Sequence, residues 1–105
     1  MGNREGWENY ETWAIKLHID NEESSYEAWT GRAGELIDDD GDTVAGARGT
    51  LADELKAEHE EAMPELEGFA ADLLNAAFGE VNWYEIAEAM LRAAIENREY
   101  EKANA

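Results

Sequence analysis

Residues 81–98, VNWYEIAEAMLRAAIENR, contain the clearest structural signal in this sequence. Asn82 is a residue type that caps helix N-termini, and Glu85, three residues later, matches the capping box, in which its side chain returns to the backbone N–H of the cap. Val81 and Ile86 occupy the two positions of a hydrophobic staple. Apolar residues then continue from Ile86 at helical spacing. The stretch therefore predicts an amphipathic helix.

Two further helices are predicted immediately upstream. In residues 64–80, PELEGFAADLLNAAFGE, Pro64 stands at a helix start and Gly79 just past a helix end. Apolar residues between them recur at helical spacing. Thr50 resembles the N-cap of an earlier helix whose apolar stripe continues toward position 62. Three consecutive helices are thus expected to fill residues 51–98.

The N-terminal half gives a less uniform pattern. In residues 9–21, NYETWAIKLHIDN, apolar residues fit helical spacing, but every second residue of 13–19 is apolar, as in a strand. We predict a helix, because Asn9 can cap it and no second strand of comparable quality is available for pairing. A shorter helix that carries Tyr26 and Trp29 is expected to follow.

Residues 36–43, LIDDDGDT, lie within residues 30–49, where five glycines and an aspartate run predict a long acidic loop. The alternating aspartates match the first ligand positions of an EF-hand calcium loop. The pattern then fails, because Thr43 replaces the required glycine and Gly49 replaces the bidentate Glu at the twelfth position. We therefore expect only weak cation binding, with no metal site and no other cofactor.

These patterns together predict a mainly α fold, a compact bundle of four or five helices that forms one domain over residues 1–105. Frayed tails are expected at residues 1–8 and 99–105, and an acidic glycine-containing loop at residues 30–49. The predicted core takes apolar residues from each well-signalled helix: Tyr10, Trp13, Leu17, Leu55, Leu66, Phe69, Leu73, Ile86, Met90 and Leu91.

Charge is the most unusual property of the chain. It contains 26 Asp and Glu against 8 Lys and Arg, a formal net charge of −18. Such a surface disfavours nucleic acid and anionic membranes and favours positively charged partners. There is no cysteine, no apolar run long enough to cross a bilayer, and no signal-peptide core at the N-terminus. We expect a cytoplasmic protein that binds neither nucleic acid nor membrane directly.

The two histidines do not form a catalytic pattern. His59 opens HEEAM, so Met63 stands where the zinc motif H-E-x-x-H needs its second histidine. We expect His59 to be solvated and His18 to be a surface or interface residue. Nothing in the chain resembles a Ser-His-Asp set, a P-loop or a dinucleotide fingerprint.

One enzymatic alternative comes from paired glutamates. Magnesium-dependent all-α nucleotide pyrophosphohydrolases place two carboxylates on one helix face. Two glutamate pairs in this sequence have the spacing to do the same: Glu58 with Glu61, and Glu85 with Glu88. With 19 glutamates in the chain such pairs arise by chance, and few basic residues are near enough in sequence to clamp a phosphate. We therefore predict that the protein is not an enzyme, with this hydrolase as the alternative.

The acids are concentrated in the middle of the chain. Nine lie in residues 20–42, opposed by Arg32 alone, and eight lie in residues 53–72, opposed by Lys56 alone. Duplex DNA carries one negative charge per ~1.7 Å of axis, so eighteen net charges correspond to roughly 30 Å of duplex. A folded domain of this size could present a DNA-binding channel with a field similar to that of DNA.

Two blocks of the sequence resemble a family. The resemblance is to small acidic proteins of phages and mobile elements. It covers about a third of the chain, in two blocks: residues 7–23, WENYETWAIKLHIDNEE, and residues 72–91, DLLNAAFGEVNWYEIAEAML. The resemblance implies a mobile-element origin and carries over no catalytic residue. In charge and size the chain is also similar to the DNA-mimic inhibitors of phages and plasmids, the anti-restriction and anti-CRISPR proteins.

These observations predict an acidic DNA-mimic inhibitor, acting in a bacterial host cell, that occupies the basic nucleic-acid-binding surface of a defence complex. An acidic adaptor, or a halophilic protein without mimicry, is the remaining alternative beside the hydrolase. The predicted partner-binding surface consists of acids only: Glu22, Glu23, Asp38, Asp39, Asp40, Asp42, Glu58, Glu60, Glu61, Glu65 and Glu67.

Overall fold

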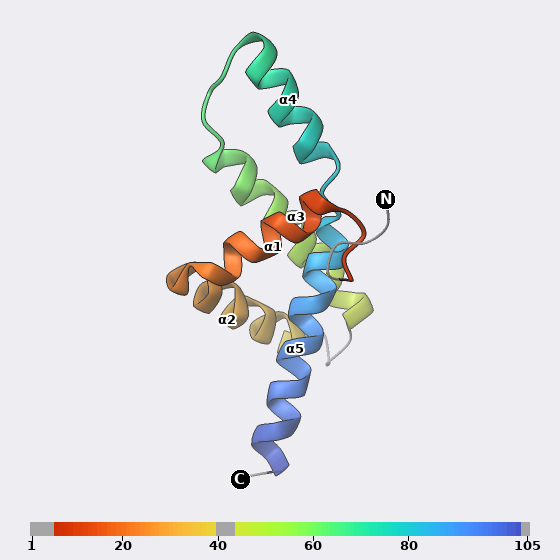
Figure 1. The fold of residues 1–105 in the computed structure, drawn as a ribbon. Coiled ribbons are helices and arrows are strands. Elements are labelled where there is room, and N and C mark those ends of the chain that lie inside the picture. The colour runs from red at the N-terminus through yellow and green to blue at the C-terminus, as the bar shows by residue number, and fades with distance from the viewer. Residues whose placement is uncertain (1–5, 40–43, 104–105) are drawn as a thin grey trace.

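The computed structural model describes residues 6–39 and 44–103, and these residues form five helices and no strand (Figure 1). The helices are α1 (Tyr10–Asn21), α2 (Glu23–Asp39), α3 (Val44–Ala62), α4 (Gly68–Gly79) and α5 (Trp83–Ala103). The predicted mainly α bundle of four or five helices is confirmed.

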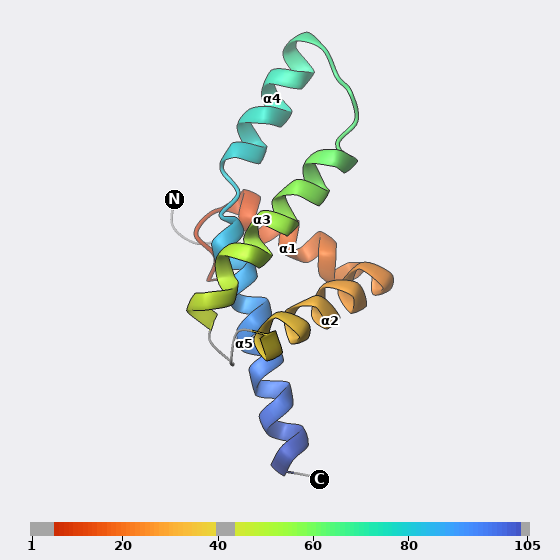
Figure 2. The ribbon, with the colours of Figure 1, turned by 180° about the vertical axis from the view of Figure 1, so that it is seen from behind.

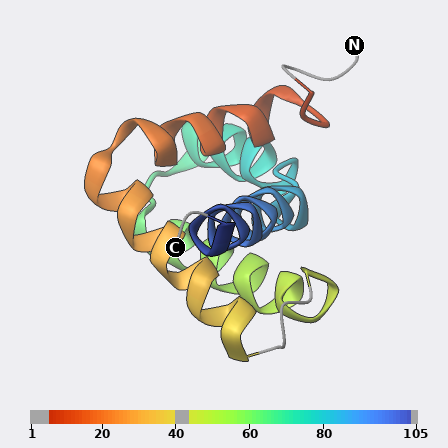
Figure 3. The same cartoon turned by 90° about the horizontal axis from the view of Figure 1, so that it is seen from below.

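Helix α5 is the centre of the bundle. Figure 3 shows it end-on, with α1, α2 and α3 arranged around it, and its most extensive contacts are with α3 and α2. Ile86, Ala87 and Leu91 are fully buried, and Met90 is nearly so. These residues form a stripe broad enough to be covered by more than one helix. The helix predicted from residues 81–98 therefore organises the fold.

The core is a single cluster of apolar side chains from α1, α2, α3, α5 and the segment before α5. Trp29 and Trp83 contribute its two large aromatic rings. Val81 and Ile86, the predicted staple pair, are both buried in it. The largest fully buried side chains are Ile19, Ile37, Leu51, Leu55, Ile86, Leu91 and Thr12. Burial of one such apolar side chain stabilises a fold by about 1.5–3 kcal/mol.

Residues 10–21 form a helix, as predicted, and not the alternative strand. Asn9 has extended backbone dihedrals, and its side chain accepts a hydrogen bond from the backbone N–H of Thr12, as an N-cap does. Ile19 is buried, whereas Tyr10 and Leu17 are exposed, so the face that contacts the core differs from the predicted one. No described segment forms a strand that could have paired with this stretch.

The predicted loop at residues 30–49 is wrong. Helix α2 continues through Asp39, and α3 already begins at Val44, so most of the stretch is helical. Each helix-interior glycine, such as Gly31 or Gly34, costs ~1 kcal/mol relative to alanine. Burial of Trp29, Leu36 and Ile37 on one face of α2 outweighs that cost.

An EF-hand loop is incompatible with this arrangement, because what would be its last six positions, residues 44–49, are already helical. Residues 40–43, the second half of LIDDDGDT, lie outside the described residues. The proposed cap at Thr50 is also wrong, since that residue lies inside α3.

Helix ends near the C-terminus differ from prediction too. Pro64 lies in a non-helical connection, and α4 begins only at Gly68, whose φ of 61° suits glycine. Helix α5 extends to Ala103, so residues 99–103 are helical rather than frayed. At the other end, Trp7 packs against the core, which anchors part of the predicted N-terminal tail.

The C-terminal end of α3 and the whole of α4 project from the bundle (Figures 1 and 2). The molecule consequently measures 54 × 29 × 26 Å. Among the described helices none packs extensively against α4, and no residue of α4 is buried. The expected core positions Leu66, Phe69 and Leu73 are therefore exposed, because their apolar stripe faces no other helix.

Candidate functional site

The N-termini of α1 and α5 meet in a partly buried hydrogen-bond network. Oδ1 of Asn9 accepts from the backbone N–H and the hydroxyl of Thr12, at 2.9 and 2.7 Å. Oγ1 of Thr12 in turn accepts from the backbone N–H of Asn82 at 2.8 Å. Nδ2 of Asn9 donates to the carbonyl of Glu80 at 2.8 Å. Thr12, at the centre of this network, is fully buried, and the network joins the two sequence blocks, residues 7–23 and 72–91.

Asn82 caps α5 as predicted, since its Oδ1 accepts from the backbone N–H of Glu85 at 3.0 Å. The predicted return contact of the capping box, from the Glu85 side chain to the backbone N–H of Asn82, is wrong. The carboxylate of Glu85 accepts from the backbone N–H of Glu8, at 3.0 and 3.2 Å, because the N–H of Asn82 is already bonded to Thr12. Glu8 returns to Asn82, accepting from its Nδ2 at 2.9 Å. Two carboxylates thus lie at the partly positive N-terminus of α5.

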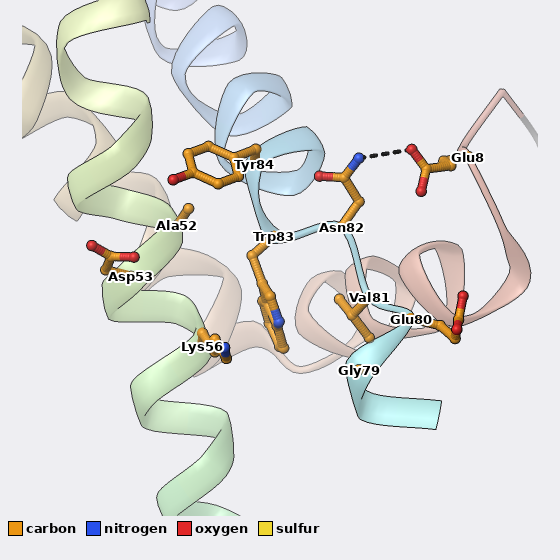
Figure 4. Close-up of a pocket in the computed structure, with 10 residues that line it drawn as sticks. All are labelled: Glu8, Ala52, Asp53, Lys56, Gly79, Glu80, Val81, Asn82, Trp83 and Tyr84. Atoms are coloured by element: carbon orange, nitrogen blue, oxygen red, sulfur yellow. Dashed lines mark hydrogen bonds between the residues drawn. The ribbon is translucent and has the colours of Figure 1, made fainter. Parts of the chain in front are cut away.

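A cavity of about 490 Å³ opens beside this junction (Figure 4). Helix α3 contributes one wall with Asp53 and Lys56, and the other wall comes from Glu8 and from residues 79–84. In Figure 4, Trp83 and Tyr84 extend from the second wall toward α3. The ionisable side chains that line the cavity are four charged groups and one phenol: Glu8, Asp53, Lys56, Glu80 and Tyr84.

Arg32 of α2 is bound by carboxylates of its own chain. Its Nε and Nη2 donate to the two oxygens of Glu54 on α3 at 2.8 and 2.7 Å, and its Nη1 donates to Glu35 at 3.1 Å. The hydrogen bonds that Arg32 donates, first those to Glu54 and then the one to Glu35, raise the pKa of Arg32 above its ordinary value. The same contact with Arg32 lowers the pKa of Glu54. The guanidinium is therefore neutralised locally.

A second internal cluster centres on Glu88 of α5. Its carboxylate accepts from Arg48 of α3 at 2.9 Å and from Arg92 at 3.2 Å. These hydrogen bonds, that of Arg48 first, lower the pKa of Glu88. Lys16 similarly pairs with Asp20 at 2.6 Å. Four basic side chains of the bundle are thus paired with acids of the same chain.

The predicted partner-binding acids with described side chains do not form such ion pairs. Seven of them have described side chains, and all seven are exposed: Glu22, Glu23, Glu58, Glu60, Glu61, Glu65 and Glu67. The ion pairs of the described residues include none of these seven. Asp38 and Asp39 lie in the last turn of α2, and the predictions for Asp40 and Asp42 lie outside the described residues.

The structure divides these acids into separate groups. Glu22 and Glu23 lie at the corner between α1 and α2, whereas Asp39 ends α2, about 24 Å away along the helix. The remaining group lies on residues 57–80, which we call the α3–α4 hairpin (Figure 2). This hairpin contains seven carboxylates and no Lys or Arg. It adds Asp72 and Glu80, which sequence reasoning missed although the absence of basic residues from positions 57–80 was a visible signal.

The paired glutamates of the hydrolase alternative differ in their surroundings. Glu85 is bonded to the N–H of Glu8, and Glu88 to two arginines, so both carboxylates already have protein partners. Glu58 and Glu61 are exposed on α3. Within residues 6–39 and 44–103, no three potential ligands are grouped closely enough to hold a metal ion.

His59 is not the solvated residue that the sequence suggested. It is half-buried between two core tryptophans, with ring centroids 6.5 Å from Trp29 and 5.4 Å from Trp83. Its Nδ1 lies 2.7 Å from the carbonyl of Leu55. The sequence prediction failed because the two tryptophans come from α2 and α5, and only tertiary packing brings them to α3. His18 is exposed on α1, as predicted.

Comparisons with protein-family models, with curated protein sequences and with solved structures found no match to this chain. The resemblance of residues 7–23 and 72–91 to acidic phage proteins therefore stays a prediction. In the part of the chain that the structure describes, no helix is both long and apolar enough to cross a membrane.

Proposed function

We propose that the protein is an acidic mimic of DNA that occupies the basic nucleic-acid-binding surface of a bacterial defence complex, of the anti-CRISPR or anti-restriction type. One observation carries the proposal: the bundle pairs Lys16, Arg32, Arg48 and Arg92 with internal acids, while the hairpin glutamates stay exposed. Four of the eight Lys and Arg residues are thus paired internally, and with a net charge of −18 the field outside the protein is dominated by carboxylates.

The magnitude of the charge supports partial mimicry. Eighteen net negative charges along an axis of 54 Å give about one charge per 3 Å, against one per ~1.7 Å in duplex DNA. The average density is thus about half that of a duplex. A channel that attracts phosphates by counterion release will attract such a surface by the same long-range force. Binding requires no deformation of a real duplex.

The target is obtained by capture from a bacterial lysate at low salt, and the test is displacement of labelled duplex DNA from the captured complex. One variant replaces four hairpin acids by lysine: Glu58, Glu61, Glu65 and Glu67. A matched control makes the same change of charge on the exposed faces of α2 and α5: Glu27, Glu96, Glu99 and Glu101. We expect the hairpin variant to lose most of the displacement and the control to retain most of it.

Single substitutions should have small effects, because an exposed ion pair contributes less than ~1 kcal/mol. Affinity should fall as salt rises, chiefly through slower association, because steering is screened beyond a Debye length of ~8 Å at physiological ionic strength. Simultaneous binding of DNA and this protein to the target, without competition, would disprove mimicry. Turnover of nucleoside triphosphate that Glu58→Gln abolishes would instead support a hydrolase.

A further inference from the structure

Helix α4 is apolar over most of its circumference, and none of its residues is buried. Eight of its twelve residues are Ala, Leu or Phe, and its polar side chains are limited to Asp72 and Asn75. Phe69 is 78% exposed and Leu73 is 56% exposed. A helix normally packs a wide apolar face such as this one against another element. The exposure of α4 in this protein therefore indicates that another surface covers it.

The helix also has few internal means of remaining folded. A helix of twelve residues is marginal in water without tertiary contacts. The N-cap residue Glu67 makes no side-chain capping hydrogen bond, and Gly68 follows it with a positive φ. A binding partner would supply the packing that the bundle does not provide, so its binding should stabilise α4.

A cleft next to α4 brings carboxylates close to apolar residues. The space of about 630 Å³ between α4 and the connection that precedes it is lined by both apolar and polar side chains, with Leu66 and Leu74 among the apolar ones. Glu65 and Glu67 line the same cleft. Carboxylates of the hairpin therefore lie beside apolar residues, and a complementary segment carries Lys or Arg beside its apolar side chains.

We propose that the α3–α4 hairpin docks a basic amphipathic helix of another protein, whose apolar face covers α4 and whose Lys or Arg residues pair with the hairpin acids. The charge argues against a second copy of this chain. Two hairpins would bring together two sets of seven carboxylates with no Lys or Arg between them, and like charges placed opposite one another oppose association. The inference shares one assumption with the proposed function, namely that the partner is positively charged.

The probe is a labelled 18-residue peptide of Lys and Leu, arranged so that its leucines form one helical face. A second peptide of equal length and charge has Gln in place of Leu. Fluorescence anisotropy at physiological salt measures their binding to the full chain. We expect the Lys/Leu peptide to bind at least about tenfold more tightly, because only it can bury apolar surface on α4.

The variant Phe69→Ser with Leu73→Ser should reduce the affinity for the Lys/Leu peptide to that for the Lys/Gln peptide, without changing the latter. A matched control, Leu17→Ser with Tyr26→Ser, makes the same kind of change on exposed residues of α1 and α2 and should leave both affinities unchanged. Circular dichroism checks that each variant is folded. Equal binding of the two peptides to the natural chain, or an unaffected α4 variant, would overturn the inference.

Self-association is the remaining outcome. Sedimentation that shows a dimer of the natural chain and a monomer of the Phe69/Leu73 variant would assign α4 to a second copy and would also overturn the inference. The experiments distinguish failure of docking at α4 from failure of the proposed DNA mimicry. Loss of Lys/Leu binding in the α4 variant, with no DNA competition by the natural chain, leaves docking intact and rejects mimicry. The reverse result retains mimicry and rejects docking at α4.

Discussion

At the scale of single residues, the contact between Arg32 and Glu54 links stability to pH. Arg32 holds the pKa of Glu54 below its ordinary value of 4.5, so the contribution of Glu54 to stability is complete above that value and is lost as pH falls through the folded-state pKa. We expect Glu54→Gln to be less stable than the natural chain at pH 7, and the difference to shrink by about pH 3. Urea unfolding at both pH values measures it. A difference that is constant with pH would contradict the assignment, and Glu58→Gln, on the same helix but outside these ion pairs, serves as the control.

At the scale of helices, the same substitution should reduce stability much more in α3 than in α4. Leu55 of α3 is fully buried, whereas Leu73 of α4 is more than half exposed. Leu55→Ala removes packed methyl groups and leaves a cavity, so we expect a loss of about 2–5 kcal/mol. Leu73→Ala should change stability by about 0.5 kcal/mol or less. Urea unfolding of the two variants provides the comparison. A loss of similar size for both would mean that α4 packs against the bundle in solution.

At the scale of the whole molecule, the net charge of −18 opposes compaction. Added sodium chloride shortens the Debye length from ~30 Å at 0.01 M to ~3 Å at 1 M. We expect the melting temperature to rise over this range, because repulsion among many acids outweighs the few exposed ion pairs that salt weakens. The four-lysine hairpin variant, with a smaller net charge, should show a smaller rise. A melting temperature that does not change with salt in the natural chain would contradict this explanation.

The sequence by itself determined those features that depend on neighbouring residues. Asn9 and Asn82 were identified as caps because capping is a contact over three residues, and α5 was identified because its apolar stripe and its start signal agree. The acidic character of residues 57–80 also follows directly from composition. Each of these properties depends on local geometry or on counting, and therefore needs no knowledge of which helices meet.

Only the tertiary structure decided which faces are covered. The glycines of α2 suggested a loop, but burial of Trp29 and Ile37 against other helices outweighs their helix-breaking tendency. Leu73 has the periodicity of a core residue and remains exposed, because periodicity defines a face without supplying its partner. The Thr12 hydroxyl bonds the N–H of Asn82, seventy positions along the chain, which no local pattern encodes. Burial and pairing over such distances are properties of the assembled bundle, because they depend on where the chain brings α1, α2, α3 and α5 together.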